Sequence, residues 1–386
     1  MKKKTVRPEN LRSINMSLVL SHVLSAEQPP SRAQVAGDIG LTRATASKLG
    51  DELVEGGILE EVTPPPTQRP GRPAQVLLGS RQIIGLGLDI GVESQRAVAV
   101  NLQGEQVASA VSTTDLRKSD ALEELPALTA LVTEVCEQLP PTSRIAGLTI
   151  SVPGLVDAAS GTLLDAPNLG WHDVNICDEV ASHLPKSGLC ERIPHPRIGN
   201  EANLASIPVA YRAPGAPSPF NDFAYLSGGI GVGAAMVSKH KVITGEHGWA
   251  GEIGHLTVDP HGIPCRCGSN GCLERYIGGE ALETALAPGN EEELEQSATA
   301  LGIALATVIN LLDVSTVVLG GGITGLYERT QDTVSAVIEK RAMAARRHPI
   351  QIVSASAGEE ASALGAAYFA LEPVIKNPAE FLTPAN

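Results

Sequence analysis

The sequence lacks the segments that would carry it out of the cytoplasm or into a membrane. The basic run Lys2–Lys4 is not followed by the apolar stretch and small-residue cleavage site of a secretory signal peptide. The apolar stretch Ser17–Leu24 has fewer than half of the roughly 20 residues that a transmembrane helix needs. We therefore expect a cytoplasmic protein with no membrane partner.

Cysteine is scarce and unevenly placed. The 386 residues include six cysteines, three of which fall between Cys265 and Cys272. This distribution is unlike a disulfide framework, and clustered cysteines in a cytosolic chain more often bind a metal. Cys136, Cys177 and Cys190 have no such neighbours, so we expect them to be core or surface thiols.

The excess of acidic residues argues against nucleic-acid binding by the chain as a whole. The formal net charge is −14, yet residues 1–48 carry eight basic residues against three acidic ones. Residues 1–79 have a charge of +2 and residues 80–386 a charge of −16. A basic module in front of an acidic body is the distribution expected of a DNA-binding protein.

A segment rich in proline and glycine divides the chain. Residues 1–60 have helical patterns, residues 61–79 contain the proline-rich segment, and residues 80–386 alternate strand-like apolar runs, glycine turns and helical stretches. This organisation predicts two domains, residues 1–79 and 80–386, of which the second is of the α/β class.

The first predicted element is an amphipathic helix over residues 9–25. The apolar positions at helical spacing are Leu11, Ile14, Leu18 and Val19. Because side chains three, four and seven positions apart share one side of a helix, we expect these four to form its buried face.

Two shorter helices with a turn between them are predicted next. Ser31 followed by Gln34 has the capping-box pattern of a helix start, and Gly40 suits the left-handed residue that ends such a helix. Thr42 can cap a third helix that runs to about Glu55. A short helix, a glycine turn and a capped second helix make a helix-turn-helix.

Short or basic hydrogen-bond donors occupy the first turns of the third helix. They are Arg43, Thr45, Ser47 and Lys48. Side chains at the start of a recognition helix meet base edges and phosphates in the major groove, so we expect these four to contact double-stranded operator DNA. The alternative is a helix-turn-helix that serves as a dimerisation module and does not bind DNA.

The proline-rich segment carries a second candidate DNA contact. Residues 58–59 and 76–78 can pair as the strands of a wing, with Arg69 and Arg72 at its tip between prolines. Arginines held in an extended chain suit insertion into a narrow minor groove. The alternative is a linker with incidental arginines. With the wing, residues 1–79 are predicted to be a winged helix-turn-helix.

The body contains a series of motifs in a fixed order. They are the strand-like run 83–91, the segments 147–157, 168–171, 199–203 and 226–233, the block 247–255, the cysteine block 265–274 and the glycine run 319–323. This order resembles the ROK family, which groups bacterial repressors, uncharacterised open reading frames and sugar kinases. The resemblance covers nearly all of residues 83–386. With the helix-turn-helix in front, the whole chain resembles the ROK transcriptional regulators.

The resemblance implies the fold class. It implies an α/β chain in which an N-terminal winged helix-turn-helix is followed by a two-lobed, actin-like or ribonuclease H-like ROK domain. A ligand cleft is expected between the two lobes, and the C-terminal helix is expected to return to the first lobe.

The cysteine block predicts a metal site. The candidate ligands are His255, Cys265, Cys267 and Cys272, with the spacing H-x9-C-x-C-x4-C. Three thiolates and one imidazole complete a tetrahedral zinc site, so we expect a structural rather than a catalytic zinc ion. The alternative is three free or disulfide-bonded cysteines.

Further residues match motifs that hold sugar hydroxyls in members of the ROK family. The matching positions are Asn200, Glu201, Glu252, His255 and Glu274. Gly154 would let the main chain approach the sugar. Carboxylates and amides suit a polyol because each can pair with hydroxyls. The resemblance thus implies a small-molecule effector, by family default a sugar or sugar derivative. Alternatively, Glu252 and Glu274 only brace the zinc loop.

The positions that a sugar kinase needs are altered. Kinases of the family have a phosphate loop resembling Asp-x-Gly-Gly-Thr, but Val92 and Glu93 here bring a β-branched side chain and a negative charge. Glu201 stands at the general-base position and is one methylene longer than aspartate. The second glycine motif has Gly228 in place of a threonine. These departures predict a sensor without catalytic residues.

Together these features predict a DNA-binding transcription regulator. We expect an effector to close the two lobes and to change the spacing of two helix-turn-helix modules in a homodimer or dimer of dimers. The regulator can be a repressor or an activator. The alternatives are an active ATP-dependent sugar kinase with a DNA-binding appendage, a regulator that responds to a non-sugar metabolite, and a protein–protein scaffold.

Overall fold

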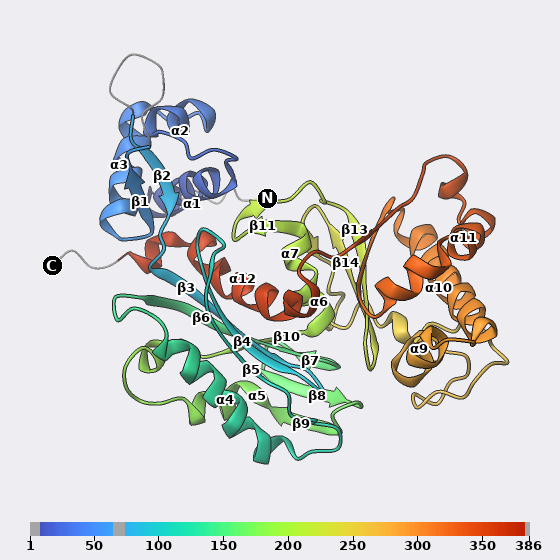
Figure 1. The fold of residues 1–386 in the computed structure, drawn as a ribbon. Coiled ribbons are helices and arrows are strands. Elements are labelled where there is room, and N and C mark those ends of the chain that lie inside the picture. The colour runs from blue at the N-terminus through green and yellow to red at the C-terminus, as the bar shows by residue number, and fades with distance from the viewer. Residues whose placement is uncertain (1–7, 65–73, 383–386) are drawn as a thin grey trace, which may run out of the picture.

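The computed structural model describes residues 8–64 and 74–382, which form a small N-terminal module and two α/β lobes (Figure 1). The module lies against the first lobe. The final helix of the chain also packs on the first lobe, after the chain has passed through the second (Figure 1).

The N-terminal module has the predicted helices. Its elements are α1 (Pro8–Ser25), α2 (Arg32–Asp38), α3 (Arg43–Glu55), β1 (Leu59–Val62) and β2 (Val76–Gly79). The capping box of α2 is formed: Gln34 Oε1 accepts the N–H of Ser31 at 2.8 Å, and the Ser31 hydroxyl accepts the N–H of Gln34. The Thr42 hydroxyl caps α3 by accepting the N–H of Thr45 at 3.2 Å. Local capping chemistry therefore sets both helix starts.

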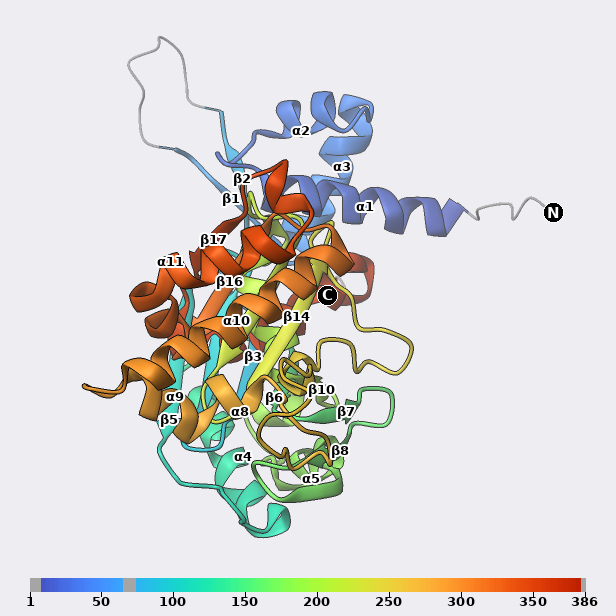
Figure 2. The same ribbon diagram turned by 90° about the vertical axis from the view of Figure 1, so that its right-hand side faces the viewer.

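The strands of the predicted wing are present. β1 and β2 pair antiparallel, with Leu59 opposite Gly79 and Val62 opposite Val76. Figure 2 shows both strands beside α1, in the part of the molecule formed by the N-terminal module. Arg69 and Arg72, the predicted minor-groove contacts, lie outside the described residues.

The predicted buried face of α1 is wrong for three of its four residues. Leu11, Ile14 and Leu18 are about half exposed, at 54%, 51% and 48%. The buried side chains are those of Met16, Val19, Leu20, Val23 and Leu24. The helix carries two apolar stripes with the same spacing, and periodicity cannot tell which of them faces the core.

The core of the module continues into the first lobe. Leu49 and Leu53 of α3 belong to the same buried cluster as Ile83, Ala146 and Leu371 of the body. Polar contacts join the same surfaces: on α1, the Ser13 hydroxyl donates to Asn377 Oδ1 at 2.8 Å and the Ser17 hydroxyl donates to the carbonyl of Ile375 at 2.9 Å. The helix-turn-helix is thus packed on the body.

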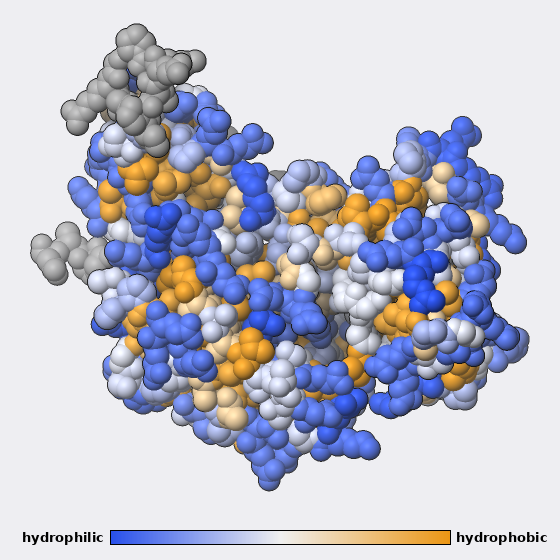
Figure 3. Space-filling model, viewed as in Figure 1, coloured by the Kyte–Doolittle hydropathy of each residue, from blue (hydrophilic) through white to orange (hydrophobic). Residues whose placement is uncertain are grey.

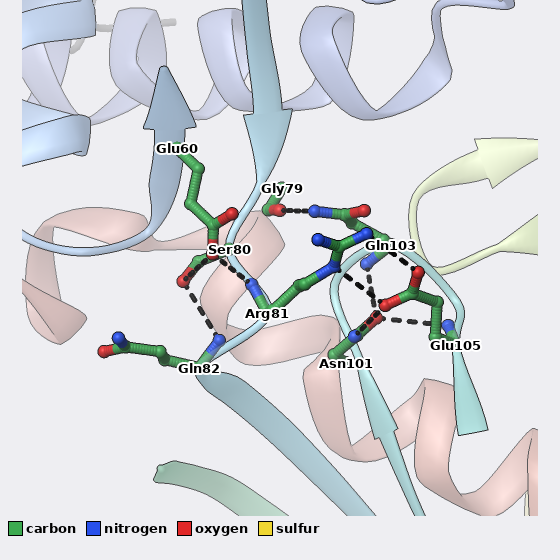
Figure 4. A network of polar contacts seen from close by, with 8 residues as sticks. All are labelled: Glu60, Gly79, Ser80, Arg81, Gln82, Asn101, Gln103 and Glu105. Atoms are coloured by element: carbon green, nitrogen blue, oxygen red, sulfur yellow. Dashed lines mark hydrogen bonds and ion pairs between the residues drawn. The ribbon is translucent and has the colours of Figure 1, made fainter. Parts of the chain in front are cut away.

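A polar network spans the junction between module and body (Figure 4). The Glu60 carboxylate on β1 accepts the N–H of Arg81 at 2.7 Å, and the Arg81 guanidinium pairs with Glu105 at 3.1 Å. Gln103 donates to the carbonyl of Gly79 at 2.8 Å. Two of these hydrogen bonds, Glu60–Arg81 and Gln103–Gly79, connect a residue of the module with a residue of the body. They therefore restrict rotation of the module on the first lobe.

The first lobe is built on a five-stranded sheet. Its elements are β3 (Ile83–Ile90), β4 (Gln95–Asn101), β5 (Gln106–Ser112), α4 (Ala121–Glu137), β6 (Arg144–Val152), β7 (Leu155–Asp157), β8 (Thr162–Ala166), β9 (Trp171–Asn175), α5 (Ile176–His183), η1 (Cys190–Arg192) and β10 (Arg197–Asn200). The strand order is β10-β6-β3-β4-β5, and every residue of the central strand β3 is buried. β6 runs parallel to β3, whereas β4 runs antiparallel to it.

The last helix, α12 (Ala361–Lys376), covers the face of this sheet opposite α4, as expected for a C-terminal helix that returns to the first lobe. The contact depends on glycine: a Cβ at Gly87 would lie 2.1 Å from the carbonyl oxygen of Ala363. The absence of a side chain at this glycine lets α12 approach β3 closely. The last helix of the chain thus packs on the strand that leads into the cleft.

The second lobe has its own five-stranded sheet, in the order β15-β14-β13-β16-β17. Its elements and those that lead into it are α6 (Glu201–Ala205), α7 (Ile207–Ala210), β11 (Tyr211–Ala213), β12 (Ala216–Pro217), β13 (Phe223–Gly228), β14 (Val232–Ser238), β15 (Lys241–Val242), η2 (Ile253–His255), α8 (Glu274–Ile277), α9 (Gly279–Leu286), α10 (Glu291–Leu312), β16 (Thr316–Gly321), α11 (Ile323–Arg341), η3 (Ala344–Arg346), β17 (Gln351–Ser354) and η4 (Gly358–Glu360). After α12, η5 (Pro378–Phe381) returns to contact α1 and α12. α10 and α11 pack on each other and share a buried cluster with the sheet.

Among the described helices, α10 alone has the length and apolar composition that would suffice to cross a membrane. It lies in the core of the second lobe, and 56% of its most apolar window is buried there. Packing against α11 and the sheet accounts for the apolar composition of this helix.

Candidate effector cleft and metal centre

A cleft of about 350 Å³ lies between the two lobes. The surface in Figure 3 is hollowed between the lobes. All six residues predicted to bind the effector line it: Gly154, Asn200, Glu201, Glu252, His255 and Glu274. The first three come from the first lobe and the segment that follows it, and the others come from the second lobe. Closure of the lobes would therefore bring two sets of polar groups onto one ligand.

Asn200 connects main-chain segments that form the first-lobe wall of this cleft. Its Oδ1 accepts the N–H groups of Ala202 and Asn203 at 2.9 and 3.2 Å, which caps α6, and its Nδ2 donates to the carbonyl of Gly154 at 3.0 Å. Gly154 has φ +96°, and a Cβ there would lie 2.1 Å from the carbonyl oxygen of Asp165. Glycine is thus required at this position by the neighbouring main chain.

Glu201 lines the cleft, and its carboxylate interacts electrostatically with that of the buried Asp89. Burial is the main cause that raises the pKa of Glu201 to about 7, and the Asp89 charge adds to the effect. Burial also raises the pKa of Asp89 to about 6, although the Ser151 hydroxyl donates to its Oδ1 at 2.6 Å and opposes the shift. Two carboxylates that interact in one buried site disfavour ionisation of both at once.

This pair predicts that stability falls as the pH rises. Between about pH 5 and pH 7 the folded protein holds protons on Glu201 and Asp89 that the unfolded chain has released, so the free energy of unfolding decreases with pH. The Glu201 shift corresponds to a loss of about 3 kcal/mol. Urea unfolding at pH 5, 6, 7 and 8 measures this loss in wild type and in Glu201→Gln. The free energy of unfolding of the variant is expected to change less with pH. Equal slopes in the two proteins would contradict the assignment.

Glu274 and Asn168 face each other where the two lobes meet. The Glu274 Oε2 atom accepts the N–H of Val232 at 3.2 Å. A Cβ at Gly231 would lie 2.8 Å from Asn168 Nδ2 and 3.1 Å from Glu274 Oε2, so a larger residue there would displace the ends of these two side chains. Asn168 lines the cleft but was not among the predicted effector contacts. Its motif with Trp171 was visible in the sequence and indicated no role.

Glu252 lies beside the predicted metal ligands. Loss of hydration raises the pKa of its carboxyl; His255 opposes the shift, and the Glu274 charge reinforces it. Because Glu252 and Glu274 belong to the same lobe and repel each other, a ligand that donates hydroxyl hydrogen bonds to both would relieve this repulsion.

The four predicted metal ligands meet in one cluster. The donor atoms of His255, Cys265, Cys267 and Cys272 all lie within 4.8 Å of one another. The Sγ atoms of Cys267 and Cys272 are 3.6 Å apart, and Cys265 Sγ lies 3.9 Å from His255 Nδ1. Tetrahedral zinc with Zn–S bonds of ~2.3 Å requires sulfur atoms ~3.8 Å apart. Both the donor set and the spacing therefore fit zinc.

Glycines allow the metal loop to turn tightly. Gly268 and Gly271 have φ values of +90° and +64°, and a Cβ at Gly271 would lie 1.6 Å from the carbonyl oxygen of Asp259. The N–H of Cys265 donates to the carbonyl of Ser269 at 2.8 Å and closes the turn. Left-handed glycines thus hold the thiols on one side of the loop. His255 and Cys267 also line the effector cleft, which places the metal loop in its wall.

The phosphate-loop position holds an ion pair. Glu93 lies 3.0 Å from the guanidinium of Arg117, and Val92 is buried. At the second glycine motif, a Cβ at Gly228 would lie 2.3 Å from Ile323. These positions therefore hold a carboxylate that Arg117 neutralises and a closely packed main chain.

The recognition helix presents its basic residues to solvent. Arg43 and Lys48 are exposed, while Thr45 and Ser47 are half-buried. Acidic residues later in α3 are neutralised within the module: Arg12 pairs with Glu52 at 2.8 Å, and Arg32 pairs with Asp51. The start of α3 is thus the positively charged end of the helix.

These features define a two-lobed, actin-like α/β fold of the sugar-kinase type with a winged helix-turn-helix in front. The model of the ROK family matches residues 85–372, about three quarters of the sequence. The chain belongs to the ROK family, as its motifs predicted.

Relatives and solved structures match over most of their length. The "Putative xylose repressor" of Caldicellulosiruptor sp. (strain Rt8B.4) is 29% identical over 95% of this chain and 98% of its own. A solved ROK family transcriptional regulator, a homologue of the Escherichia coli MLC protein, is 21% identical, with a TM-score of 0.75 over 96% of this chain and 99% of its own. A ROK family glucokinase from Streptomyces griseus is 24% identical, with a TM-score of 0.62 over 75% of this chain and 99% of its own. The two structures confirm the fold.

Proposed function

We propose that this protein is a DNA-binding transcription regulator controlled by a small sugar or sugar derivative. The observation that carries the proposal is the junction between module and body. A helix-turn-helix with an exposed basic recognition helix shares one buried core with the body. In that body, the predicted sugar-binding residues meet in one cleft. The similarity to a protein named as a xylose repressor supports the same function.

The proposed division of labour follows the two predicted domains. Residues 1–79 bind double-stranded operator DNA through Arg43, Thr45, Ser47 and Lys48, with Arg69 and Arg72 as further contacts. Residues 80–386 bind the effector. In a homodimer or dimer of dimers, closure of the lobes changes the distance between two recognition helices and hence their fit to paired half-sites. The protein works in the cytoplasm and needs no membrane partner.

The metal is proposed to be a structural zinc ion. His255, Cys265, Cys267 and Cys272 would hold it as a closed tetrahedral set, and its contribution would be to fix the loop. His255 turns Nδ1 toward Cys265, so its other ring nitrogen is available to the cleft. Through His255 and Cys267, this loop would couple effector binding to the second lobe.

A sensor without catalysis fits the cleft better than an active kinase does. Glu93, paired with Arg117, places a carboxylate at the phosphate position, and the raised pKa of Glu201 leaves Glu201 partly protonated near neutral pH. The competing candidate is a sugar kinase with a DNA-binding appendage, which the fold shared with a ROK glucokinase favours. A coupled ATP assay over hexoses, pentoses and N-acetylhexosamines distinguishes the two: turnover well above background would identify a kinase.

The test of the proposed function is a DNA-binding titration. Full-length zinc-loaded protein is mixed with labelled DNA from upstream of its own coding region, and fluorescence anisotropy follows binding as sugars are added. We expect salt-sensitive specific binding and a change of at least tenfold in affinity with one sugar. Absence of specific binding to any upstream fragment would contradict the DNA-binding part, and a response to non-sugar metabolites alone would contradict the sugar part.

The cleft residues make a specific prediction for this assay. Glu252→Gln keeps the side-chain volume but removes one acceptor charge, so we expect the sugar concentration for half-maximal effect to rise roughly 10-fold, the loss of one or two charge-assisted hydrogen bonds. DNA affinity without sugar should stay unchanged. Glu292→Gln on the outer surface of α10 is the matched control and should behave as wild type. If both variants respond to sugar like wild type, Glu252 does not bind the sugar and only supports the metal loop.

A further inference from the structure

A second cavity, of about 620 Å³, adjoins the effector cleft. The residues that line both spaces are Pro167, Asn168, Ile230, Arg266 and Glu274. Like the first, the second cavity is lined from both lobes, and it is nearly twice as large. The first cavity alone is close to the lower limit of ~300 Å³ for small-molecule pockets. The two together form a groove with room for a longer ligand.

The lining of the second cavity mixes both signs of charge. Its cations are Arg117, Lys118, Arg266 and Arg275, and its carboxylates are Glu93, Glu274, Glu280, Glu283 and Glu293. A phosphate or other anion would meet more negative than positive groups there. A hydroxyl both donates and accepts a hydrogen bond, so a ligand with many hydroxyls can use carboxylates and cations together. The charge pattern therefore selects a polyol over an anion.

Two of the cations have unused hydrogen-bonding capacity. The Nε atom of Arg275 is buried and has no hydrogen-bond partner among residues 8–64 and 74–382. The ammonium of Lys118 forms no ion pair within the same described ranges, and its main chain has φ +60°, a conformation that few non-glycine residues adopt. A buried donor without an acceptor is unfavourable, so Arg275 marks a place for a ligand oxygen.

We propose that the effector is a glycoside of at least two sugar units that spans both cavities. One unit lies in the first cavity beside Glu252 and His255, and the next lies in the second cavity, where Lys118, Arg275 and Glu283 bind its hydroxyls. This inference rests on the proposed function and specifies its ligand class. Lys118 belongs to the first lobe and Arg275 to the second, so the second unit stabilises the closed arrangement more than a single sugar does.

The first experiment compares matched sugars in the DNA-binding titration with full-length zinc-loaded protein. The pairs are xylose with xylobiose, glucose with cellobiose and with maltose, and N-acetylglucosamine with diacetylchitobiose; the 6-phosphates of the two hexoses are added as anionic probes. We expect one disaccharide to act at a concentration at least tenfold below that of its monosaccharide. A monosaccharide or sugar phosphate that acts equally well overturns the inference and leaves the proposed function standing. If no sugar acts at all, both are overturned.

The second experiment tests the residues. Lys118→Ala and Glu283→Gln should each raise the effective disaccharide concentration at least fivefold and leave the monosaccharide concentration within twofold. Glu292→Gln is the control on the same lobe, outside both cavities. Equal losses for both sugars would show a general effect on the cleft, and no loss would show that the second cavity stays empty; either result overturns the inference.

Discussion

Cys272→Ser is expected to abolish zinc binding and to cause the largest loss of stability of any single substitution considered for this protein. Cys272 is fully buried, and the next residue, Leu273, belongs to the core of the second lobe. Structural zinc in small sites contributes about 10–16 kcal/mol of apparent binding free energy at pH 7. Loss of one thiolate removes a large part of this, more than the ~1–3 kcal/mol of an ordinary destabilising substitution.

Zinc content per chain and differential scanning calorimetry measure this effect. Wild type should carry one zinc ion, and Cys272→Ser should carry none and unfold at a markedly lower temperature. Cys177→Ser is the matched control, because Cys177 is an equally buried thiol that belongs to the core of the first lobe. That variant should keep its zinc. A zinc-replete Cys272→Ser protein would exclude the assigned ligand set.

The same variant separates the metal loop from the DNA-binding module. The buried cluster that contains Leu49 and Leu53 draws its body residues from the first lobe, the β3–β4–β6 region and α12, and includes none from the metal loop. We therefore expect Cys272→Ser to bind operator DNA at low temperature while its response to sugar is lost. Loss of both properties together would show that the loop supports the whole chain.

Local chemistry explains why most of the N-terminal module could be predicted. The hydroxyls of Ser31 and Thr42 cap helices through bonds to residues three positions away, so sequence spacing alone identifies them. The buried face of α1 could not be identified in this way. Both stripes of that helix are apolar, and the choice between them depends on where the last turn of α12 and the residues after it pack, more than 350 positions away in the sequence.

The residues of the site could be predicted where a sequence motif identified them. The four metal-ligand candidates cluster and the six cleft candidates line one cavity, because the fold brings their motifs to the border between the lobes. The sequence could not show a further reason for glycine at Gly154: a Cβ there would meet the main chain of Asp165 in the same lobe. Asn168 and the second cavity could not be predicted, because they depend on how the two lobes are placed relative to each other.

Arg43→Ala is expected to abolish specific binding to operator DNA. Arg43 is the first residue of α3 and is exposed, and Lys48 further along the same helix is also exposed. Both therefore lie where a recognition helix meets the major groove. A bidentate arginine contact to a base is worth about 1–3 kcal/mol, and a homodimer carries the substitution in both modules. The combined loss brings specific affinity close to the level of non-specific binding.

Anisotropy titrations at several salt concentrations test this and distinguish base contacts from phosphate contacts. Arg43→Ala should lose sequence preference, whereas Lys48→Ala should weaken all DNA to a similar degree and reduce the salt slope by about 1 for each phosphate that is no longer neutralised. Arg192→Ala, which removes an exposed arginine of the first lobe, is the control for the change in charge. Zinc content and unfolding temperature should match wild type in all three variants. If Arg43→Ala retains wild-type specificity, then α3 does not read the DNA sequence, and the helix-turn-helix is better explained as a contact between subunits.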